Sequence, residues 1–182
     1  MRKVKIFDGK NHKTNILGAL LLALSLLAQS LRLVLPLPLF VSMFIVGTLL
    51  NAILLMATSA AGLKPALIIA WAAPAVALLQ GQLPGLPFVP LVAVGNTAYI
   101  LLLDTFKNRN KCFVLVAASS GKTATLFFGA WALLLALNYP PLIGTSFSFV
   151  MSWPQFVTAL AGGLLGQFLL ARLGGKLSAG PY

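Results

Sequence analysis

Acidic residues are almost missing from this sequence, and their scarcity excludes several kinds of site. Among 182 residues there are two acids, Asp8 and Asp104, one histidine, His12, and one cysteine, Cys112. A single cysteine cannot form a disulfide within the chain, and a cysteine–histidine metal site needs more ligands than these. Two aspartates far apart in the sequence do not provide the paired carboxylates of acid–base catalysis. We therefore expect no enzymatic activity, no metal site and no cofactor.

Charge of either sign is scarce, whereas apolar residues are abundant. Only 8% of the residues are charged and 59% are hydrophobic, while a soluble domain is roughly 25% charged. This composition predicts an all-α integral membrane protein. The net charge of +11 comes from bases that stand between apolar runs rather than along one soluble face. For that reason we do not expect nucleic acid to be a partner.

Six apolar stretches predict six transmembrane helices within a single membrane domain over residues 1–182. They cover about 15–35, 39–62, 66–82, 88–106, 113–137 and 152–173, close to the roughly 20 residues that a membrane span requires. The third stretch is the weakest, because it is short and contains Pro74. Tyr139, Pro140 and Pro141 begin a long connection before the last span.

Basic residues fall almost entirely on one side of this predicted topology. Arg32 lies on the opposite side, and Lys122 lies inside the fifth span. The other bases are Arg2, Lys3, Lys5, Lys10, Lys13, Lys64, Lys107, Arg109, Lys111, Arg172 and Lys176. Since cytoplasmic loops of membrane proteins carry an excess of lysine and arginine, the pattern predicts that both termini are cytoplasmic, with residues 1–14 as a basic tail.

Lys122 is the most informative single residue, because it is predicted to lie ~15 Å inside its span. A lysine at that depth costs on the order of 3 kcal/mol unless it has a partner or reaches water. No acid within a span can neutralise it, since Asp104 lies at the end of the fourth span, where we expect it to pair with Lys107 or Arg109. In one interpretation Lys122 faces a wet pocket and meets an anionic or strongly accepting substrate group. In the other it snorkels or bonds to helix carbonyls.

Other polar and aromatic side chains are candidates for the same pocket. Asn96 is predicted to lie at a depth comparable with Lys122, and Gln155 lies near the start of the last span; either could instead join helices by a hydrogen bond. Trp131, Tyr139 and Trp153 are predicted to lie toward the outer membrane face. An aromatic belt at the interface explains these three, and a stacking wall for a flat heterocycle is the alternative.

The predicted spans hold no acid and no histidine at mid-membrane, and the chain has no nucleotide-binding motif. Proton-coupled transporters usually carry ionisable groups at that depth, although sodium could be held by neutral oxygens. The sequence therefore favours a protein that binds a solute and depends on other subunits for energy.

In several features the chain resembles the substrate-binding S component of energy-coupling-factor (ECF) vitamin transporters. The likeness covers nearly the whole chain, and its six-span length is one feature. The motifs that carry it are Ala19-x-x-x-Ala23, Val94-Gly95-Asn96, a lysine-containing fifth span after Asn108-Arg109-Asn110-Lys111, and the run from Gln155 to Gly163 that opens the sixth span.

This resemblance implies a high-affinity binding subunit for a vitamin or related micronutrient in a prokaryotic cell membrane. The solute would enter from outside, into a pocket formed by the outer loops and helices four to six. A transmembrane T component, contacted by Ala19 and Ala23, and two ATPase subunits would be the partners, and the latter would hydrolyse ATP. The candidate substrate-binding residues are Lys122 and Asn96 within the pocket, with Trp131, Tyr139, Trp153 and Gln155 nearer its mouth.

Two alternatives from other classes stay open. A stand-alone channel or facilitator would move solute in vesicles without ATPase partners. A scaffold subunit without a transport role would bind no small molecule and would purify with a fixed complex. A membrane enzyme is a more distant possibility, because acid–base residues are so few.

Overall fold

The computed structural model describes residues 9–35, 38–138 and 140–177, and within these ranges the regular elements are helices. The elements are α1 (Gly9–Val34), α2 (Leu39–Met56), a π-helical turn η1 (Ala57–Ala61), α3 (Leu63–Leu79), α4 (Phe88–Thr105), α5 (Lys111–Ala136), α6 (Pro141–Val150) and α7 (Trp153–Leu177). The predicted all-α fold is thus confirmed. Residues 1–8 of the predicted basic tail lie outside the described residues, and α1 begins within that tail.

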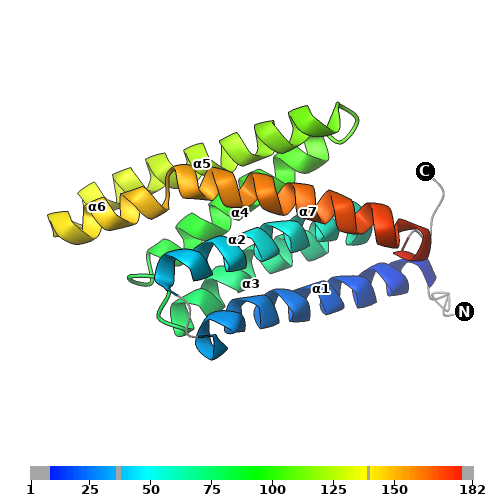
Figure 1. Cartoon of the computed structure of the whole chain (residues 1–182), viewed down its shortest axis with the longest axis horizontal. Helices are drawn as coiled ribbons and strands as arrows, with labels where there is room; N and C mark the ends of the chain where they lie inside the picture. Colours follow the sequence, from blue (N-terminus) through cyan, green and yellow to red (C-terminus); the bar gives the residue numbers. More distant parts are fainter. Residues whose placement is uncertain (1–8, 36–37, 139, 178–182) are drawn as a thin grey trace, which may run out of the picture.

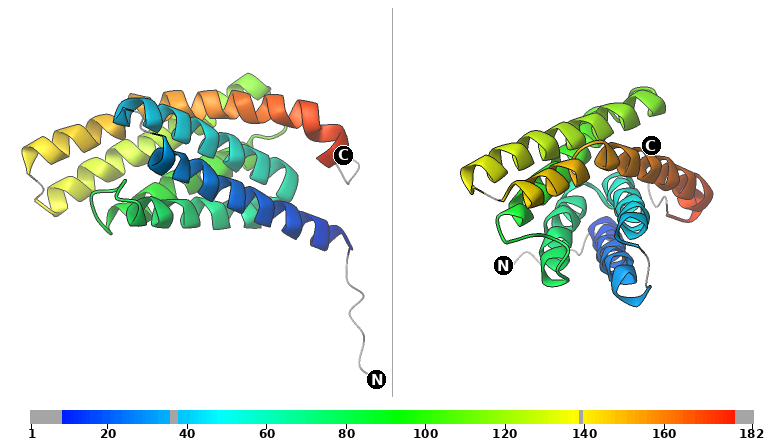
Figure 2. Two further views of the ribbon diagram at one scale, coloured as in Figure 1. Left: turned by 60° about the horizontal axis from the view of Figure 1, so that its bottom comes forward. Right: turned by 60° about the vertical axis from the view of Figure 1, so that its left-hand side comes forward.

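The long helices form an elongated bundle in which neighbours in sequence run in opposite directions (Figure 1). The packing is most extensive between α2 and α7, while α4 packs against α3 and α5, and α1 packs against α2 and α3. We call the end where α1 begins and α7 finishes the terminal end, and the other the distal end. The last turns of α5 and the short helix α6 project at the distal end (Figure 1, Figure 2).

Helix length and composition are typical of a multi-pass membrane protein. Five helical segments are long and apolar enough to cross a membrane: His12–Val34, Phe40–Ala61, Phe88–Thr105, Lys111–Ala136 and Gly144–Leu173. The remaining long helix, α3, is apolar but has only 17 residues, so it spans ~26 Å at ~1.5 Å per residue.

Proline, asparagine and glycine define several helix ends. Pro38, Pro87 and Pro140 stand immediately before α2, α4 and α6, where a missing backbone donor costs nothing because the first helical N–H groups have no partner within the helix. Asn110 caps α5, since its side chain accepts a hydrogen bond of 2.9 Å from a backbone N–H of the first turn. Gly62 has a φ of 92°, a conformation that favours glycine and that separates η1 from α3.

The six predicted spans correspond to α1, α2 with η1, α3, α4, α5 and α7, but α6 was not expected. Residues Pro141–Val150, within the predicted connection, form a helix that packs against α5 and α7. One of its side chains, Phe147, meets Phe88 of α4 edge-on with ring centroids 4.4 Å apart. Such long-range packing stabilises a short helix whose own sequence gives little helical signal.

The interior is densely packed toward the terminal end. Leu54, Ile69 and Ile100 are completely buried there. Glycines allow the close contact between α2 and α7, because a Cβ atom at Gly162 would lie 2.5 Å from the Thr48 carbonyl oxygen. The small-residue face of α7 is therefore occupied by α2 within the same chain.

Candidate functional site

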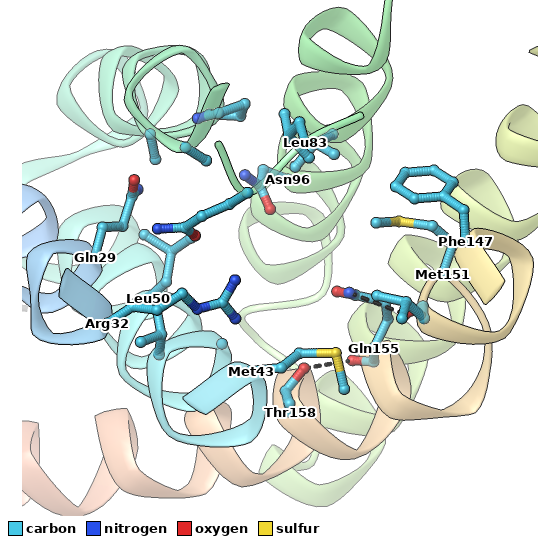
Figure 3. A pocket seen from close by; sticks show the side chains of 18 of the residues that line it. Gln29, Arg32, Met43, Leu50, Leu83, Asn96, Phe147, Met151, Gln155 and Thr158 are labelled. Atoms are coloured by element: carbon cyan, nitrogen blue, oxygen red, sulfur yellow. Dashed lines mark hydrogen bonds between the residues drawn. The ribbon is translucent and has the colours of Figure 1, made fainter. Parts of the chain in front are cut away.

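A cavity of about 520 Å³ lies in the distal half of the bundle, and all seven α-helices and the α3–α4 connection contribute to its wall. Cavities of this size accept small organic molecules. Most of the wall is apolar, and its larger apolar side chains are Met43, Val46, Leu50, Leu83, Phe147 and Met151. Figure 3 shows Met43 and Phe147 on different sides of the open space, with polar side chains between them.

Lys122 of α5 lines this cavity and is only 3% exposed. Its ammonium donates hydrogen bonds to Asn51 Oδ1 at 2.6 Å and to Asn96 Oδ1 at 2.8 Å. The Tyr99 ring lies beneath it, with 5.6 Å from Nζ to the ring centroid, a favourable placement for a cation. Within the described residues both hydrogen-bond partners of Lys122 are neutral, and an ammonium has three N–H donors. Besides these two asparagines and the Tyr99 ring, Lys122 Nζ faces the cavity, where a molecule with an acceptor group could meet it.

The two asparagines are oriented by backbone carbonyls on their far sides. Asn51 Nδ2 donates to the Gly47 carbonyl oxygen at 2.8 Å, one turn earlier on α2. Asn96 Nδ2 donates to the Ala70 carbonyl oxygen on α3 at 3.4 Å. Ala70 is four residues before Pro74, which has no N–H with which to bond that carbonyl. Because of this proline, the Ala70 carbonyl is free to accept from Asn96 Nδ2. That hydrogen bond orients the Asn96 amide so that its oxygen faces Lys122.

Arg32 and Gln29 bring a second set of polar groups into the same cavity. Figure 3 shows the Arg32 guanidinium extending from α1 toward the centre of the cavity, with Gln29 nearby on the same helix. Of the described residues that line the wall, none is acidic. Asp104 instead pairs with Lys107 at 3.1 Å on the surface, as the sequence predicts. Arg32 therefore brings positive charge to a site that also holds the amine of Lys122.

The structure brings together three of the residues that the sequence singles out. Lys122, Asn96 and Gln155 all line the cavity. Gln155 Nε2 donates to the Val150 carbonyl oxygen at 3.2 Å, which connects the start of α7 to the end of α6. The side-chain oxygen of Gln155 is directed toward the open space (Figure 3).

Two of the three predicted aromatic residues, Trp131 and Trp153, lie elsewhere. Trp131 is 58% exposed and Trp153 is 49% exposed, and neither is among the described residues of the cavity wall. Trp153 packs with Phe40, Phe44 and Phe149 in a cluster formed by α2, α6 and α7. Tyr139 lies outside the described residues. This placement favours a belt at the membrane interface for Trp131 and Trp153.

Sequence reasoning missed three polar contributors to the site. The sequence analysis uses Arg32 only as evidence for the orientation of the chain in the membrane. It does not predict Asn51 or Gln29 as site residues. A usable signal existed, because Gln29 and Arg32 are three residues apart and so share one face of a helix. Arg32 is also the one base predicted on its side of the membrane.

The polar side chains of the described cavity wall are groups that donate and accept hydrogen bonds. They are an ammonium, a guanidinium, carboxamides and hydroxyls. No group of three histidine, cysteine or acidic residues that could hold a metal ion occurs in the described part of the chain. Comparison with protein-family models, curated proteins and solved structures finds no match to this chain.

Replacing Asn96 by leucine tests the hydrogen-bond network around Lys122. The substitution removes one of the two acceptors of the ammonium and leaves the Ala70 carbonyl without its donor, so we expect a loss of about 2 kcal/mol in the free energy of unfolding. Unfolding in detergent micelles would measure it, with Asn108→Leu in the exposed α4–α5 connection as the matched control. Equal stability of the two variants would contradict the network.

Proposed function

We propose that this chain is the solute-binding S component of an ECF-type importer, and that a vitamin or related micronutrient binds in the cavity next to Lys122. One observation carries the proposal: a buried ammonium, compensated only by neutral asparagines among the described residues, lines a cavity of about 520 Å³. Placing a lysine there costs several kcal/mol of free energy, and a hydrogen bond to a strongly accepting solute group would offset that cost. The resemblance in sequence supplies the transporter class.

Energy would come from partner subunits rather than from this chain. The described cavity wall has no aspartate, glutamate or histidine that could carry a proton. In the proposed complex two ATPase subunits hydrolyse ATP, and a T component contacts α1. Ala19 and Ala23 are exposed on that helix together with Leu20 and Leu27, so this face is available to a partner or to lipid.

The proposed topology has six spans, with both termini in the cytoplasm and the distal end outside. Its support is the distribution of charge, since Lys64, Lys107, Arg109 and Lys111 all lie in or beside the connections of the terminal end. Arg32 is near the distal end. Because positive charge accumulates on the cytoplasmic side, the cavity would be loaded from outside, between the α3–α4 connection and α6.

The single cysteine offers a direct test of this orientation. Cys112 is exposed at the start of α5, at the terminal end, so a membrane-impermeant maleimide should label it in inside-out vesicles and leave it unlabelled in intact cells. The matched control carries Cys112→Ser and Leu137→Cys, which moves the thiol to the distal end of the same helix. That variant should give the reverse pattern. Labelling of Cys112 in intact cells would overturn the proposed orientation.

Mass spectrometry of small molecules that purify with the protein tests the binding role. After gentle solubilisation from its native membrane, the wild-type chain should retain one solute at near-equal molar amount, and the ligand should be released on denaturation. A preparation that is folded yet retains nothing, even after incubation with a metabolite extract, would contradict the proposed function.

A further inference from the structure

We infer that Arg32 of α1 forms an oxyanion-binding subsite of this cavity, with Gln29 beside it as the acceptor for a donor group of the same solute, and that the solute is an organic acid with a largely apolar body. The inference rests on the proposed function, because it assumes that the cavity binds a solute. It adds the chemical class of that solute, the residue that recognises its charged group and the residue that accepts from its donor group.

The two side chains act as a unit because of their spacing. Gln29 and Arg32 are three residues apart on α1, so both project from one helix face. Both belong to the cavity wall, and the guanidinium reaches the open space (Figure 3). A guanidinium presents N–H groups in a planar fork that matches two oxygens of one carboxylate or phosphate.

One polar atom of each side chain is buried without a protein partner, although Arg32 as a whole is only partly buried, and this favours a binding role over a structural one. Gln29 is 2% exposed. Within the described residues neither the Gln29 side-chain oxygen Oε1 nor Arg32 Nε has a hydrogen-bond partner. Buried polar groups are normally paired, and leaving one unpaired is unfavourable. A solute that brings an acceptor to Arg32 and an N–H or O–H donor to Gln29 satisfies both groups at once.

The charge of the cavity selects an anion. Arg32 contributes a positive charge, Lys122 adds an amine that donates hydrogen bonds, and no acid is present among the described lining residues. Asp104, the acid that the structure describes, is engaged by Lys107 in an exposed pair. A cationic solute would add positive charge next to Arg32 in a poorly solvated space, whereas an anion offsets the charge of Arg32. The apolar wall around Met43, Leu83 and Phe147 then accommodates the body of the molecule.

The experiment uses the full-length protein and a metabolite extract separated by ion exchange into acidic, neutral and basic fractions. Each fraction is added to wild-type protein and to Arg32→Gln, Arg32→Lys and Gln29→Leu variants. The thermal unfolding midpoint and the retained molecules are then measured. Arg172→Gln is the matched control, because it removes an exposed arginine at the terminal end. Phosphatase treatment of the acidic fraction distinguishes a phosphate group, whose effect is lost, from a carboxylate, whose effect persists.

We expect only the acidic fraction to raise the unfolding midpoint of the wild type and of Arg172→Gln. Retention of the acid should fall by about 30-fold or more in Arg32→Gln, and less in Arg32→Lys, which keeps the charge but loses the fork. Gln29→Leu should reduce retention several-fold, and it remains informative if Arg32→Gln does not fold.

Three results would contradict the solute class, the subsite and the proposed function, respectively. Stabilisation by the neutral or basic fraction would overturn the organic-acid class and leave the binding role intact. An acid retained equally by the wild type and by folded Arg32→Gln and Gln29→Leu variants would overturn the subsite. No retention from any fraction would contradict the proposed function itself.

Discussion

Replacing Lys122 by methionine is expected to weaken solute binding by about 100-fold, or ~2.7 kcal/mol. Methionine keeps an unbranched apolar stem in the same space, so the substitution removes little more than the ammonium. A hydrogen bond from a charged group contributes about 1.5–3 kcal/mol, and truncating one side of a buried charged contact often costs more. Since two of its three donors are already used by Asn51 and Asn96, the predicted loss corresponds to one strong contact.

The matched control for Lys122→Met is Lys111→Met, at the exposed start of the same helix. Both variants lose one positive charge, but only one of them changes the cavity. Equilibrium dialysis with the solute retained by the wild type would measure affinity, and detergent unfolding would measure stability in parallel. Lys122→Met protein that is folded and binds as tightly as the wild type would show that the lysine has only a structural role.

The Gly162→Leu variant is expected to lose most of its folded protein. A Cβ atom alone at this position would lie 2.5 Å from the Thr48 carbonyl oxygen and 2.6 Å from Asn51 Cβ. The first of these neighbours is backbone of α2 and cannot rotate away, so α7 has to move. Overpacking of this kind costs about 3 kcal/mol or more. It also displaces Asn51, which holds Lys122, and binding should fall with stability.

Gly144→Leu on α6 provides the control for this effect, because among the described residues no atom outside the adjacent residues and the helix's own backbone lies within 4 Å of a Cβ built there. The same change of residue should therefore leave the yield of monodisperse protein and the unfolding midpoint close to the wild-type values. If Gly162→Leu also behaved like the wild type in both measurements, the close α2–α7 contact would be disproved.

Composition and hydropathy were sufficient to predict the all-helical class of fold and the position of Lys122 inside the bundle. A lysine in the middle of an apolar run is unusual enough to be recognised without a structure. The sequence placed Asn96 at the same depth as Lys122, but the hydrogen bonds of Lys122 to Asn96 and Asn51 could not be predicted, because these asparagines lie in different helices that meet only through tertiary packing. Helix α6 was missed for the same reason, since contacts such as Phe147 with Phe88 stabilise it.

Pro74 has a second structural effect that helix propensity alone does not predict. In the sequence it weakens the third predicted span, as proline does in any helix. In the folded chain the carbonyl of Ala70 that it leaves free accepts a hydrogen bond from Asn96. Long-range pairing of this kind is invisible in a single sequence, and the same holds for the unpaired groups of Gln29 and Arg32.

An experimental structure of the protein purified together with its retained solute would test the central claim most directly. We predict density for that molecule inside the cavity, with one polar atom within about 3 Å of Lys122 Nζ and its acidic group against Arg32. Density for the solute at another site, with Lys122 and Arg32 contacted only by protein groups, would contradict binding in this cavity.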